Sequence, residues 1–209
     1  MTGRTISMLC ILLHIICKIG WEGLTAISTV ALVIIGGLAV GYAKGQLDDF
    51  RRESRVKHLI ELVTQFEQNP LAEQRRELGR QRTSGNQLKA LDVNDPPYEL
   101  HDILNFFEHM GYLLEENYLD LQGVSTEFHY WIFHIWADAQ ELVKYEQSQD
   151  SIYYRHFRKM VERLAEEEKR RLGKFEFPPQ EDVVDFYRDE AHLAAGSPIP
   201  RQRRRKPRK

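Results

Sequence analysis

The chain has 209 residues, of which 42% are hydrophobic, and a formal net charge of -2. Its two cysteines, Cys10 and Cys17, both precede the longest apolar run, so the polar remainder contains none. These counts exclude a disulfide framework, a cysteine-ligated zinc site and a thiol nucleophile from that remainder, which is long enough for one ordinary domain.

Charge is unevenly distributed along the chain. From Lys44 to Pro200 there are 20 basic and 30 acidic residues, whereas Arg201–Lys209 has seven basic residues and no acidic one. An acidic body followed by a basic tail does not fit a single class of charged partner.

Residues 1–20 form an apolar N-terminal extension. The segment from Ile6 to Cys17 is apolar apart from Ser7 and His14, which suits the core of a signal peptide but is short for a membrane span. Three alternatives stay open: a cleaved signal, a second membrane-embedded segment, and a biological start site downstream of this extension.

Residues 23–43 contain no charged side chain. As a helix with a rise of about 1.5 Å per residue, this segment is roughly 31 Å long, which matches the ~30 Å hydrocarbon core of a bilayer. We therefore predict a transmembrane helix at 23–43, with the lipid bilayer as its partner. Basic residues such as Lys44 and Arg51 follow the helix and few precede it, which places the C-terminal part in the cytoplasm. Gly37 and Gly41 form a G-x-x-x-G pair, a spacing that favours self-association, although glycine is common in such helices.

The apolar spacing beyond the span predicts a helical stalk over residues 44–82. Pro70 interrupts it, and the following helix, 71–82, is rich in charged residues and is predicted to be solvated. Turn-forming residues predict a linker over 83–95.

Residues 96–195 are predicted to form a helical domain. Apolar residues recur at helical spacing in three segments, with Asp95 expected to cap the first, the second beginning near Ser125 and Asp150 capping the third. A short fourth helix is expected between Pro179 and Ala194. The predicted fold class is therefore all-α, a bundle of three to four helices, with no strand pattern.

Two sequence blocks in this domain point to a family. They are ILNFFEHMGYLL at Ile103–Leu114 and the aromatic FHYWIFHIW at Phe128–Trp136, placed after a single span and a basic stalk. This order resembles a bacterial family of membrane-anchored proteins catalogued as domain of unknown function 4760, over roughly residues 24–171. The resemblance implies the architecture and a bacterial inner-membrane location, but no activity and no catalytic residues. The apolar extension and the basic tail are not part of the family pattern.

Few residues suggest chemistry. His129, His134 and Asp138 share the aromatic helix, and His134 and Asp138 are i,i+4 neighbours, which makes the three weak candidates for a metal site. The favoured alternative is that the histidines are packed and hydrogen-bonded in the core. His101 beside Asp102 is a lone dipeptide without the further ligands of a phosphohydrolase. No phosphate-cradling or nucleophile motif is present, so we expect no catalytic residue and no cofactor.

Residues 196–209 are predicted to be a disordered basic tail. Its continuous cationic run can bind anionic lipid or the phosphates of a nucleic acid, and the run consists of Arg203, Arg204, Arg205 and Lys206. A solubilising end and a clamp on the acidic body are the alternatives.

These features together predict a non-enzymatic, membrane-anchored cytoplasmic module that binds another protein or regulates one. A binder of nucleic acid or anionic lipid acting through the tail is the alternative, and an enzyme using His, Asp or Glu of the helical domain is the third.

Overall fold

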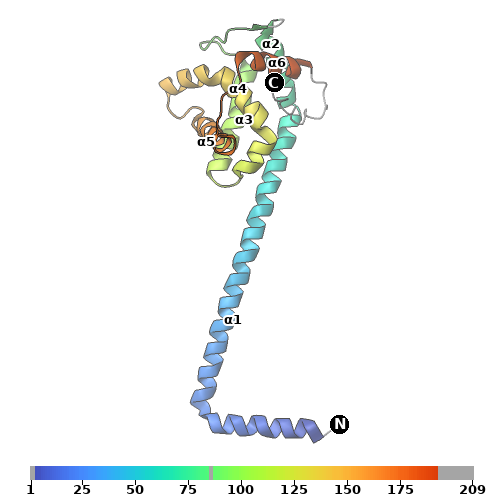
Figure 1. Cartoon of the computed structure of the whole chain (residues 1–209), viewed down its shortest axis with the longest axis vertical. Helices are drawn as coiled ribbons and strands as arrows, with labels where there is room; N and C mark the ends of the chain where they lie inside the picture. The colour runs from blue at the N-terminus through green and yellow to red at the C-terminus, as the bar shows by residue number, and fades with distance from the viewer. Residues whose placement is uncertain (1–2, 85–86, 193–209) are drawn as a thin grey trace. The chain divides into compact units, whose positions relative to one another are not determined.

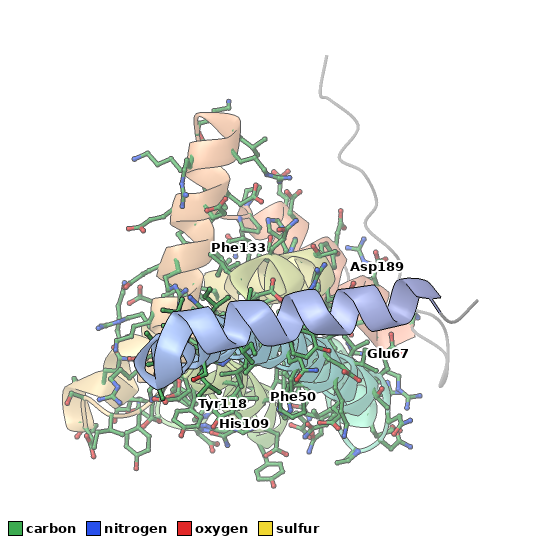
Figure 2. All side chains as sticks on the ribbon, turned by 90° about the horizontal axis from the view of Figure 1, so that it is seen from below. Phe50, Glu67, His109, Tyr118, Phe133 and Asp189 are labelled. Carbon is green, nitrogen blue, oxygen red and sulfur yellow. The ribbon has the colours of Figure 1, made fainter. Side chains whose placement is uncertain are left out.

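The structure is a computed structural model, which describes residues 3–84 and 87–192 (Figure 1). The described residues form six helices and two very short strands. These are α1 (Gly3–Glu67), α2 (Leu71–Arg82), β1 (Thr83–Ser84), β2 (Gln87–Leu88), α3 (Tyr98–Glu115), α4 (Leu121–Gln149), α5 (Arg155–Leu172) and α6 (Gln180–His192). The predicted all-α class is therefore confirmed.

The chain divides into two units, residues 1–52 and residues 53–209. In the first unit, every side chain from Ser28 to Arg52 is exposed, including the large apolar ones. The segment Ser28–Glu67 of α1 is long and apolar enough to cross a membrane, judged by length and composition. A helix that is apolar all round and uncovered by protein is what a lipid environment accommodates.

The second unit is a helical body that includes the last turns of α1. Leu62 and Phe66 are buried there, with 4% and 0% of their surface exposed. Phe66 packs against the rings of α3 and α4 residues at centroid distances of 5.1 to 5.8 Å, and its partners are Phe106, Phe107, Phe128 and Trp131. The buried residues of helix α4 extend from Val124 to Val143.

Helix α2 differs from its prediction as a solvated end of the stalk. It packs against α3 and α6 and buries Leu78 together with Arg75 and Arg82. Both guanidinium groups face carboxylates of other helices, so charge at these positions does not mean exposure. Helix α2 therefore belongs to the body and not to the stalk.

The segment predicted as a linker contains a small hairpin. Thr83 pairs with Leu88 and Ser84 with Gln87 in an antiparallel register. Each strand has only two residues, which is too short for an alternating apolar pattern, so sequence periodicity could not predict them.

Helices α3, α4 and α5 begin at residues that differ from the predicted ones. Helix α3 starts after Pro97 without a side-chain cap, so Asp95 is not its cap. Asp120 caps α4 by accepting a hydrogen bond from the Gly123 backbone N–H at 2.7 Å, ahead of the predicted start. Helix α5 follows Tyr154 rather than Asp150. The expected fourth helix is present as α6.

Candidate functional site

The most polar part of the interior is a seam between α2, α4 and α6. At its first layer, Arg82 donates to Asp138 through Nε at 2.9 Å and through Nη2 at 2.6 Å. The Tyr187 hydroxyl donates to the same carboxylate at 2.8 Å. The Arg82 and Asp138 side chains are only 4% and 3% exposed, so this ion pair is enclosed and hydrogen-bonded on both sides.

The protonation states of this layer follow from its burial and its charges. Burial disfavours the Arg82 cation, but the hydrogen bond and charge of Asp138 outweigh it and raise the pKa of Arg82. Burial, followed by the negative charge of Asp138, raises the pKa of Tyr187 well above its ordinary value. The phenol therefore stays protonated and acts as a donor, and the guanidinium stays charged.

The second layer is less completely bonded. Trp131 donates its indole N–H to Glu190 at 2.9 Å, and Arg75 Nε lies 3.5 Å from the other carboxylate oxygen. That approach is an ion pair without hydrogen-bond geometry, because Arg75 Nε and Nη1 and Glu190 Oε2 lack hydrogen-bond partners. Arg75 instead covers the Phe66 ring at 4.0 Å. Burial lowers the pKa of Arg75 and raises that of Glu190.

Both layers follow from residue spacing. Arg75 and Arg82 on α2, and Trp131 and Asp138 on α4, are each seven residues apart, so each pair lies on one helix face. Between the layers, Gly79 lets α2 approach the α6 backbone. A Cβ at Gly79 would lie 2.6 Å from the Tyr187 carbonyl oxygen, closer than real Cβ atoms come.

The three candidate metal ligands make separate contacts. Asp138 belongs to the seam with α2 and α6. His129 Nε2 lies 3.7 Å from Glu168 of α5. The ring Nδ1 of His134 is 2.6 Å from the Tyr130 carbonyl oxygen on its own helix. Within residues 3–84 and 87–192, no group of three or more potential ligands is arranged to hold a metal ion.

His101 and Asp102 also diverge. His101 Nδ1 is 2.8 Å from the Tyr154 hydroxyl, whereas Asp102 accepts a hydrogen bond from Gln74 on α2. Burial, helped by the nearby carboxylates of Glu146 and then Glu108, raises the pKa of Tyr154 to about 12. The two neighbours thus serve separate contacts between helices.

Glu108 of α3 supplies the missing cap of α5. Tyr154, at the N-cap, has a φ of 50° and makes no side-chain cap bond. The Glu108 carboxylate accepts from the backbone N–H groups of His156 at 3.1 Å and Phe157 at 2.7 Å. A carboxylate at this end is also favoured by the helix dipole.

A shallow cavity of about 310 Å³ lies between α3 and α5. Its floor includes Leu114 and Met160, and charged side chains line its rim. Hydrogen bonds from Lys159 at 2.9 Å and from His156 at 2.8 Å lower the pKa of Glu115 to about 2. Glu115 therefore stays ionised and is matched by its own neighbours.

Two sequence candidates have no contacts to describe. A Cβ at Gly37 or Gly41 would meet nothing within 4 Å, so the G-x-x-x-G face is open, and self-association through it stays a prediction. The tail cations Arg203, Arg204, Arg205 and Lys206 lie outside the described residues.

Sequence reasoning missed the seam, although a signal for it was available. Charged or polar residues seven apart on two predicted helices can mark facing positions, but their partners on α6 are distant in sequence. Because α2 was predicted to be solvated, Arg75 and Arg82 were not predicted to make buried contacts.

Comparison with known proteins identifies a family. The family described as Domain of unknown function (DUF4760) matches residues 26–164, more than half of the chain. No curated protein and no solved structure matches the chain. The matched residues include α2, α3 and α4 with their parts of the seam, and they end before α6. The chain therefore belongs to the family of this domain of unknown function.

Proposed function

We propose that the chain is a membrane-anchored helical module that binds another protein on the cytoplasmic side of a bacterial inner membrane and carries out no reaction of its own. This proposal rests on how the buried polar groups are bonded. Arg82, Asp138 and Tyr187 bond to one another across three helices. A catalytic site instead needs such groups around a space for substrate.

The apolar helix supports the location. The segment Ser28–Glu67 contains a stretch that is long and apolar enough to cross a membrane. The exposed basic side chains that follow the apolar run include Lys44, Arg51 and Arg52, and they favour the cytoplasmic side. An internally bonded body held at a membrane is suited to presenting a surface to a partner.

The experiment is affinity isolation of full-length protein from detergent-solubilised membranes, beside a version ending at Pro200. Bound protein, lipid and nucleic acid are analysed after cross-linking. A protein partner cross-linked to α2–α6 and retained by both versions supports the proposal. If neither version retains a protein partner, the proposal fails.

The basic tail gives the second candidate function. Four consecutive cations at 203–206 can bind phosphates of anionic lipid or nucleic acid, without sequence preference and in a salt-sensitive way. Replacing Arg203, Arg204, Arg205 and Lys206 with Gln should abolish binding to anionic vesicles and to nucleic acid at low salt. Unchanged binding to both would end this candidate.

A further inference from the structure

Helix α6 packs away from its neighbour in sequence. Helix α5 ends at Leu172 and α6 begins at Gln180, but the principal contacts of α6 are with α2 and α4. The connector, residues 173–179, has no regular secondary structure and begins at Gly173 with a φ of +76°. Fully extended, these seven residues span roughly 23–25 Å. A helix on such a connector can exchange between copies.

The groove under α6 recognises this helix specifically. Phe186 and Tyr187 are each 1% exposed in it, and Gly79 leaves room for the α6 backbone. The groove offers Asp138 to the Tyr187 hydroxyl and the Trp131 indole to Glu190. A groove with this shape and these polar groups fits an α6 helix from any copy of the chain equally well.

One end of the α6 contact is incompletely bonded. Glu190 and Arg75 are 4% and 7% exposed, yet Glu190 Oε2 and two Arg75 nitrogens lack hydrogen-bond partners. Buried polar groups that are only partly satisfied stabilise a contact least. Opening of α6 should therefore begin at its C-terminal end, which carries Glu190.

We propose that two copies of this chain exchange their α6 helices, so that Tyr187 and Glu190 of one copy complete the seam formed by α2 and α4 of the other. The exchanged dimer makes the same α6 contacts as the closed monomer. The connector changes its path and gives up the packing of Phe175 and Phe177 on Phe133 of α4. Two copies tethered in one membrane have a high effective concentration, which favours exchange. The groove walls lie inside the family match at 26–164 and the exchanged helix lies outside it.

Two full-length variants test the exchange by complementation. Gly79→Leu closes the groove, because any Cβ there lies 2.6 Å from the α6 backbone. Phe186→Asp keeps the groove intact but places a carboxylate on the buried face of α6. Chains with two different affinity tags are co-expressed in membranes. The mixed pair combines Gly79→Leu with Phe186→Asp, and each like pair contains one of these variants under both tags. Only the mixed pair contains both an open groove and an intact α6.

The mixed pair should co-purify several-fold more strongly than either like pair. The like pairs measure association through every other surface, including the open glycines of α1, so equal recovery in all three pairs overturns the proposal.

A second measurement uses the native sequence, in case the variants fail to fold. Unlabelled and ¹⁵N-labelled full-length chains carrying photo-leucine are mixed in mild denaturant and returned to lipid. Leu78 of α2 is fully buried, and cross-links between α2 and α6 are read by mass spectrometry. Links that join a labelled to an unlabelled chain support exchange. Links formed only within one isotope class overturn it.

Discussion

Replacing Asp138 with Asn tests whether the seam stabilises the body. The substitution keeps the side-chain shape but leaves the Arg82 cation, with a 4% exposed side chain, without its countercharge. Breaking a buried ion pair by removing one partner typically costs about 3–5 kcal/mol, because the remaining charge is desolvated and uncompensated. We expect the free energy of unfolding of the body to fall by about this amount.

The assay is urea unfolding of full-length protein in detergent, followed by tryptophan fluorescence. Asp185→Asn is the matched control on α6, since its carboxylate is 70% exposed and accepts from Arg188 at 3.0 Å. Loss of such a surface pair should cost about 0–1 kcal/mol. Exchanging all three bonded groups of this layer for apolar ones, Arg82→Met with Asp138→Leu and Tyr187→Phe, should recover much of the loss. If Asp138→Asn costs no more than the control, the seam is hydrated and the reasoning fails.

Three further predictions concern other contacts of the body. Gly79→Ala should lower the free energy of unfolding by about 1–3 kcal/mol, because the added Cβ collides with the Tyr187 carbonyl oxygen. An unchanged urea midpoint would show that α2 and α6 separate freely. The pKa of Glu115 is lowered to about 2, so its stabilising bonds to Lys159 and His156 are present above the ordinary value of 4.5 and are lost as the pH falls from there towards 2. Glu115→Gln should flatten that part of the acid-unfolding profile, and an identical profile would contradict the assignment. Glu108→Gln should weaken the start of α5 by about 1–2 kcal/mol, seen as faster amide hydrogen exchange at residues 156–157 but not in α6.

How far the sequence predicted the fold depends on where the determining contacts lie. Helical spacing over residues 96–195 predicted the helices of the body, because periodicity is a property of each segment alone. The start of α5 was misplaced at Asp150, because its first N–H groups are capped from another helix by Glu108.

Prediction of the candidate site was also limited to features of single segments, whereas its contacts join distant ones. His134 and Asp138 suggested a shared site because they are i,i+4 neighbours, but Asp138 bonds to Arg82 and Tyr187. The carboxylate is bound by a side chain 56 residues earlier and another 49 residues later. Local spacing carries no information about partners at such separations. The charged composition of α2 was equally misleading, because burial of Arg82 depends on this distant carboxylate.

Because α3 caps α5, the body should tolerate a cut in the loop that precedes α5. The loop before α5 exposes Ser151 and Ile152, while the start of α5 is defined by Glu108 and by the buried Tyr154. A proteolytic cut between Ser151 and Ile152 would leave both of these determinants in place. The two fragments should remain associated with α5 intact, as a nicked but folded body.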